Sequence, residues 1–159
     1  MNFLRKKNDE SYRLASMQAR IFEKSALENI PSYFFIQSFM NSKDAKSLDD
    51  LSFLLSGSSE IEIYNNVMNK VRRKEGAIYP SEIMHWIGFF YRYASYLSGI
   101  DSKTLIKNIR PSTLEKIYPL YHGMEISKAV ETIIDIKKID NRSPLERYLS
   151  LVKANKILI

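Results

Sequence analysis

The residues best suited to chemistry form a narrow polar stripe. His85, Gly88, Arg92 and Ser95 recur at spacings of three, four and three in an otherwise apolar segment, so a helix places them on one face. One interpretation is a pocket in which Arg92 binds an anion or a partner's carboxylate, with His85 and Tyr91 nearby. The other is an internal ion pair or carbonyl network that fixes the helix register, because an unpaired buried arginine is costly. We favour the internal network.

A second candidate cluster contains Tyr118, Tyr121 and His122. A catalytic histidine needs a nucleophile or a substrate proton within hydrogen-bonding distance, and this spacing specifies neither. The tyrosines are three residues apart, which favours packing of both on a central helix. His122 precedes Gly123, a pattern typical of a helix C-terminus. We therefore expect no catalytic residue here and keep the three side chains as binding candidates.

Metal and cofactor chemistry has no pattern to support it. The chain has two histidines and no cysteine, and these do not match the ligand spacing of a zinc site. Asp49 and Asp50 lack the glycine-turned, oxygen-rich loop of a calcium site. We expect no metal ion, no cofactor and a protein that is not an enzyme.

Basic residues are concentrated locally in a chain whose net charge is +6. The candidates for contact with nucleic acid or an acidic partner are Lys70, Arg72, Arg73, Lys74, Lys153 and Lys156. Each contact with a phosphate would steepen the salt dependence of binding. No helix-turn-helix with a clear recognition helix is visible. A solvated basic helix end is thus the favoured interpretation, and nucleic acid is an alternative partner.

The elements that position these residues are predicted to be helices. Glycine and proline number five each in 159 residues, which favours long helices over the many turns of a β fold. Apolar residues recur at helical spacing, without useful strand alternation. The predicted helices cover residues 10–29, 33–41, 48–55, 59–74, 80–98, 102–109, a stretch after Pro111 that Pro119 kinks or ends, 125–138 and 144–157.

Residues 80–98 are apolar nearly all round, which predicts a central buried helix. We expect a compact, all-α, multi-helix single domain around it that covers residues 1–159, because no linker divides the chain. S-x-x-E capping boxes predict helix starts at Ser59/Glu62, Ser112/Glu115 and Ser143/Glu146, the last of these opening a basic C-terminal helix over 143–159.

The compartment is predicted from what the sequence lacks. The absence of cysteine fits a reducing compartment, and the N-terminal stretch has no apolar run of the secretory type. Uncharged apolar residues never run for the length of a membrane helix. We expect a soluble cytoplasmic protein without membrane contact.

One stretch resembles a known family. The run E-I-M-H-W-I-G-F-F-Y-R-Y at 82–93 resembles the W-x-G-[YF]-x-Y-R-Y core of a small family of bacterial all-helical proteins. Tyr118, Tyr121 and His122, with Ala129-Val-Glu131 after them, look like that family's Y-x-x-Y-H segment and A-I-E helix. The resemblance covers about residues 12–136, and the basic segment 137–159 extends beyond the usual pattern.

Members of that family are often encoded beside ADP-ribosyltransferase-like toxins, so the resemblance implies an antitoxin or immunity role. The expected partner is a cognate toxin whose active site the helical surface covers. Two alternatives stay open. One is a nucleic-acid-binding regulator of its own operon, motivated by the basic residues. The other is an enzyme that uses Arg92, His85 or His122 in a buried pocket.

Overall fold

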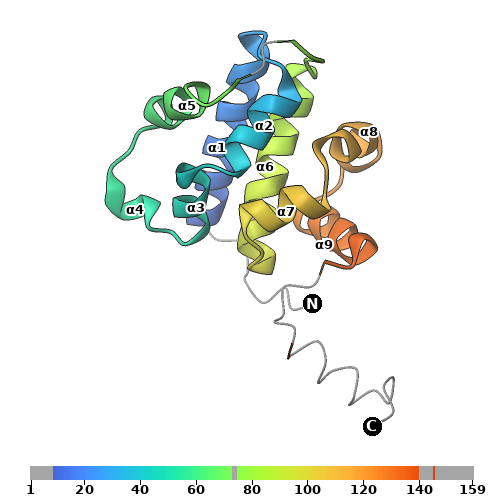
Figure 1. Ribbon diagram of the computed structural model, residues 1–159. Helices are drawn as coiled ribbons and strands as arrows, with labels where there is room; N and C mark the ends of the chain where they lie inside the picture. Colours follow the sequence, from blue (N-terminus) through green and yellow to red (C-terminus); the bar gives the residue numbers. More distant parts are fainter. Residues whose placement is uncertain (1–8, 73–74, 140–144, 146–159) are drawn as a thin grey trace.

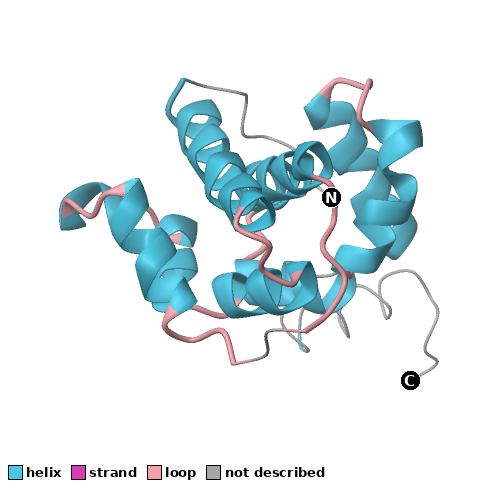
Figure 2. Cartoon of the chain, turned by 90° about the horizontal axis from the view of Figure 1, so that it is seen from above, coloured by secondary structure: helices cyan, strands magenta, loops and turns pink. Residues whose placement is uncertain are grey.

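The computed structural model describes residues 9–72, 75–139 and 145, and all regular secondary structure in these ranges is helical (Figures 1 and 2). The helices are α1 (Asp9–Leu27), α2 (Ser32–Met40), α3 (Lys43–Asp49), α4 (Phe53–Ser56), α5 (Glu60–Met68), α6 (Ser81–Ser98), α7 (Ser102–Asn108), α8 (Pro111–Tyr121) and α9 (Ile126–Lys137). They form one compact domain, which confirms the predicted fold class. Within the described ranges, no helix is both long and apolar enough to span a membrane.

Helix α6 is the centre of the fold, as its sequence predicts. It packs against α1, α3, α7, α8 and α9, and Figure 1 shows it running through the middle of the molecule. Its second half is buried without interruption from Phe90 to Leu97. Pro80 precedes the helix, and Gly99 ends it in the left-handed conformation at φ 77°, which glycine adopts without steric cost.

The contact between α1 and α6 is the most extensive one in the core, and it depends on a small residue. A Cβ atom on Gly88 would lie 2.8 Å from Phe22 Cγ, 2.9 Å from the Gln18 carbonyl oxygen and 3.0 Å from Ala19 Cα. Two of these atoms belong to the α1 backbone, so they cannot rotate away. Gly88 therefore sets how closely the two helices approach. Phe22 also packs edge-on against Phe39 of α2.

Two predicted elements have different bounds in the structure. In place of one helix over 48–55, the chain forms α3 and α4, separated at Leu51, which has a φ of 65°. The helix predicted over 59–74 ends at Met68. Lys70 and Arg72 therefore follow the helix and do not form its last turn.

The capping predictions have mixed outcomes. The Ser59 hydroxyl accepts a hydrogen bond from the Glu62 amide at 3.1 Å, which confirms that box. The Ser112/Glu115 box is wrong, because α8 begins at Pro111, a residue suited to the first helical position. Pro119 lies inside α8 and does not end it. The Ser143/Glu146 box and the helix predicted over 144–157 lie outside the described residues, apart from Leu145.

We expect Gly88→Ala to lower the free energy of unfolding by about 2 kcal/mol, because overpacking between two helix backbones outweighs the better helix propensity of alanine. Chemical denaturation followed by circular dichroism measures the change. Gly123→Ala is the matched control, since its Cβ would meet nothing within 4 Å. Equal stability of the two variants would contradict the close α1–α6 contact.

Candidate functional site

Arg92 is completely buried, and each side of its guanidinium has a partner. Its Nη1 donates to Asp49 Oδ1 at 2.6 Å, and its Nη2 donates to the Ser102 hydroxyl at 3.0 Å. Its Nε donates to Gln18 Oε1 at 2.7 Å. The guanidinium also lies 5.5 Å from the centre of the Tyr96 ring. The structure therefore has the internal ion pair: each of the three guanidinium nitrogens donates to a partner inside the protein, and no part of Arg92 is exposed to a ligand.

Gln18 links Arg92 to the helix contact at Gly88. Its Oε1 accepts from Arg92, while its Nε2 donates to the Gly88 carbonyl oxygen at 3.0 Å. The side chain is fully buried, so both ends of the amide are satisfied where an unpaired amide would be costly. Gln18 stands among apolar residues of α1 in the sequence, and that is the only signal that could have indicated its role.

Asp49 connects three helices through the hydrogen bonds of its carboxylate. Its carboxylate accepts from Arg92 and more weakly from Ser95 at 3.3 Å, both on α6. It also accepts from the Ser102 hydroxyl at 2.6 Å and the Ser102 amide at 2.9 Å, at the start of α7. Asp49 itself ends α3. One carboxylate thus ties α3, α6 and α7 together. We refer to Gln18, Asp49, Arg92, Ser95 and Ser102 as the arginine network.

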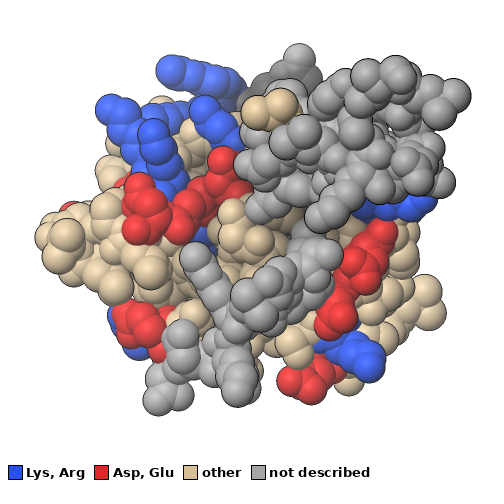
Figure 3. All heavy atoms as spheres, turned by 90° about the horizontal axis from the view of Figure 1, so that it is seen from below, with Lys and Arg blue, Asp and Glu red and all other residues tan. Residues whose placement is uncertain are grey.

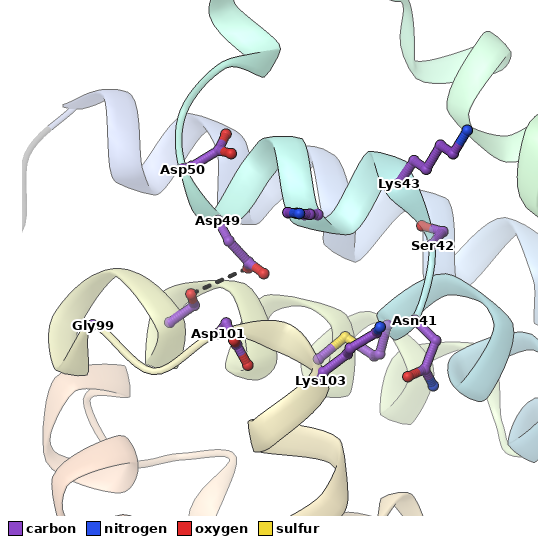
Figure 4. Close-up of a pocket in the computed structure, with 11 residues that line it drawn as sticks. Asn41, Ser42, Lys43, Asp49, Asp50, Gly99, Asp101 and Lys103 are labelled. Carbon is purple, nitrogen blue, oxygen red and sulfur yellow. Dashed lines mark hydrogen bonds between the residues drawn. The ribbon is translucent and has the colours of Figure 1, made fainter. Parts of the chain in front are cut away.

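A hollow of about 520 Å³ lies over the outer edge of the arginine network. Figure 4 shows Asp49 pointing from α3 toward α6, whereas Lys43 extends away from it. Asp49 and Ser95 line the hollow, together with Lys43, Lys46 and Lys103. Arg92 is not part of this lining, so a molecule in the hollow meets the carboxylate side of the ion pair.

The arginine network predicts that two arginine substitutions lower the free energy of unfolding by very different amounts. Arg92→Met leaves the Asp49 carboxylate without its buried cation, so we expect a loss of about 3–5 kcal/mol of unfolding free energy. Arg20→Met is the control, because Arg20 pairs with Glu60 at the surface, where such pairs contribute at most about 1 kcal/mol. Urea denaturation of both variants measures the difference. Similar losses would contradict a structural role for Arg92.

Tyr91 is also internal. It is fully buried, and its hydroxyl donates to the Ile109 carbonyl oxygen, which ties α6 to the connection between α7 and α8. Burial raises the pKa of this hydroxyl well above its usual value. The structure therefore places Tyr91 and Arg92 within the scaffold and His85 elsewhere, and it does not bring the three together.

The largest hollow among those described is an open groove of about 720 Å³ on another face. Helix α1 contributes Tyr12, Ser16 and Glu23, α6 contributes Glu82, His85, Trp86 and Phe89, and the chain from α8 to α9 contributes Tyr118, His122, Met124, Glu125 and Ile126. We call this the aromatic groove. It unites three of the sequence candidates, His85, Tyr118 and His122.

The aromatic side chains in the groove support one another. The His122 ring stacks on Tyr118 with centroids 4.4 Å apart and planes at 14°. Tyr118 meets Trp86 edge-on at 5.6 Å. At the other end, Tyr12 lies edge-on to Phe89 at 4.9 Å. The rings therefore have defined positions, and His122 fits the predicted helix end because it caps α8 with Nδ1 2.8 Å from the Tyr118 carbonyl oxygen.

The charge of the aromatic groove is opposite to that of the chain. Glu23, Glu82 and Glu125 line it, and no lysine or arginine does so within the described ranges. Glu23 lies 3.0 Å from His85 Nδ1. These glutamates cannot be distinguished in the sequence from other helical glutamates. Trp86 and Phe89 could be found, because their spacing of three marks a second apolar stripe on α6.

The remaining sequence candidates lie apart from the aromatic groove. Tyr121 is half-buried and packs on the core. Lys70 and Arg72 are exposed after α5, and Lys70 lines a hollow of about 320 Å³ with Lys43, Asn66 and Asn69. Arg73, Lys74, Lys153 and Lys156 lie outside the described residues. Among the residues with described positions, no group of three or more potential ligands could hold a metal ion.

No family model, no curated protein and no solved structure matches the chain. The resemblance seen in the sequence therefore stays a prediction.

Proposed function

We propose that the protein is a non-catalytic binding protein of the antitoxin or immunity type, which neutralises a partner toxin by covering its active site. The surface that makes the contact is the aromatic groove. The observation that carries this proposal is that the two faces of α6 differ in burial. Its inner face holds the buried arginine network, and its outer face presents Trp86 and Phe89 to an open hollow.

The composition of the aromatic groove supports a protein partner. Tryptophan and tyrosine are enriched among the residues that dominate binding energy in protein interfaces. Here Tyr12 is 41% exposed, Trp86 and Tyr118 are partly exposed, and ring contacts hold all three. Rings that are already positioned lose little conformational entropy when a partner binds. The exposed apolar residues around α4 are Leu51, Leu54 and Leu55, the last 91% exposed, and none of them has an aromatic ring.

The test is capture of the product of the adjacent gene by variants of the aromatic groove. We expect Trp86→Leu and His122→Ala each to weaken the complex about tenfold or more, as loss of a central interface residue does. His122 is exposed, so its truncation leaves the core intact, and circular dichroism checks folding of both variants. Isothermal titration calorimetry measures affinity, and rescue of growth on co-expression measures neutralisation.

Leu55→Ala is the control, because Leu55 is exposed on α4, away from the aromatic groove. Loss of binding in Leu55→Ala with full binding in the two groove variants would place the interface on α4 and refute the proposal. A purified adjacent gene product that neither binds nor harms cells would refute the antitoxin role.

A second candidate function is nucleic-acid binding, and unpaired lysines favour it. Lys43, Lys46, Lys70 and Lys103 line two adjoining hollows, and none of them forms a salt bridge within the described part of the chain. Figure 3 nevertheless shows basic and acidic side chains next to one another on the face seen from below. On that face the described residues do not form the one-sided basic patch that is typical of nucleic-acid binding.

Salt titration tests this second function. If the lysines meet phosphates, the slope of log K against log salt for duplex DNA falls by about 1 for each lysine removed in Lys43→Gln, Lys46→Gln and Lys70→Gln. The matched triple variant Lys107→Gln, Lys116→Gln and Lys128→Gln removes the same charge from α7, α8 and α9. Equal slopes for the two triple variants, or no salt-dependent binding by the native chain, would eliminate the function.

A further inference from the structure

We infer that the aromatic groove takes a cationic side chain of the partner, an arginine or a lysine, between its rings and its glutamates. The inference rests on the aromatic groove being the partner-binding surface and goes further by naming the chemistry of the occupant. It starts from a charge pattern that folding alone does not require.

Two glutamates of the aromatic groove, Glu82 and Glu125, have no lysine or arginine partner among the described residues. By contrast, Glu10 on α1, Glu28 directly after α1 and Glu60 on α5 each lie within 4.0 Å of a lysine or arginine nitrogen. Glu125 accepts a serine hydroxyl, from Ser127 at 3.0 Å. The chain has 24 lysines and arginines, yet the aromatic groove contains carboxylates that none of the described cations neutralises.

Glu23 differs from Glu82 and Glu125 because it pairs with a histidine of the aromatic groove. Its Oε1 lies 3.0 Å from His85 Nδ1, and the two side chains are 37% and 45% exposed. The pair therefore holds this carboxylate at the wall of the aromatic groove and still leaves it accessible to a second donor.

The aromatic rings of the groove provide a second kind of contact for a cationic side chain. A guanidinium or ammonium group is attracted to the face of an aromatic ring, most strongly to tryptophan, and the attraction increases as water is excluded. Trp86 and Tyr118 meet edge to face at 5.6 Å, and both line the aromatic groove beside the glutamates. A planar guanidinium can stack on a ring and donate to a carboxylate at the same time. Arginine is therefore the best-matched occupant.

The intrinsic fluorescence of the chain reports on this site directly, because Trp86 is its only tryptophan. The probe is an acetylated hexa-arginine amide, and the comparison peptide is hexa-citrulline, which has nearly the same shape without the charge. We expect saturable change of the Trp86 emission with hexa-arginine, at an affinity about tenfold or more above that of hexa-citrulline. Added salt should weaken the hexa-arginine complex, since partly exposed charge pairs are screened.

The double variant Glu82→Gln/Glu125→Gln should weaken hexa-arginine binding about fivefold or more. Glu75→Gln/Glu131→Gln is the matched control, because it removes the same charge from exposed glutamates outside the aromatic groove. Equal affinity for both peptides, no saturable binding of hexa-arginine, or equal weakening by the two double variants would each overturn the inference.

Different results would refute the aromatic groove as the interface and the cationic side chain as its occupant. If Trp86→Leu and His122→Ala weaken capture of the partner protein but Glu82→Gln/Glu125→Gln does not, the aromatic groove is the interface and its occupant is not cationic. If the two truncations leave capture unchanged, the interface lies elsewhere, whatever the peptide result.

Discussion

The buried ion pair between Arg92 and Asp49 is the interaction on which the rest of the structure depends. An enclosed guanidinium must have partners on every side, and here these come from α1, α3 and α7. The requirement fixes where those helices stand around α6. The close approach of α1 and α6 at Gly88 then places Gln18 within reach of both the arginine and the Gly88 carbonyl oxygen.

This constraint also determines which surfaces are left for function. Because the arginine network lies on the inner side of α6, the polar stripe is divided between the core and the surface. Arg92 and Ser95 are enclosed, while His85 reaches the aromatic groove. Trp86 and Phe89 on that face pack against the core with part of their surface, and their remaining surface lines a hollow with glutamates at its wall. Binding by contact is the function that such a division supports best.

The periodicity of α6 was sufficient to predict the centre of the fold and the internal position of Arg92. It could not identify Asp49, because the partner lies 43 residues away and its neighbour Asp50 is chemically the same in the sequence. The aromatic groove was only partly predictable for a similar reason. The spacing of aromatic residues in the sequence points to Trp86 and to Tyr118 separately. The contact between the two rings depends on how α8 packs against α6, which the spacing does not show. The C-terminal end of α5 and the division between α3 and α4 depend on turns that helical periodicity does not show.

The most direct test of the enclosed arginine network is solvent exchange of the Arg92 Nε–H proton, observed by ¹⁵N–¹H NMR spectroscopy of the whole protein. A proton that is buried and donated to Gln18 should exchange many times more slowly than those of Arg13 and Arg20, whose side chains are 59% and 51% exposed. Exchange of Arg92 as fast as that of these two surface arginines would contradict the enclosed network and reopen Arg92 as a ligand-binding group.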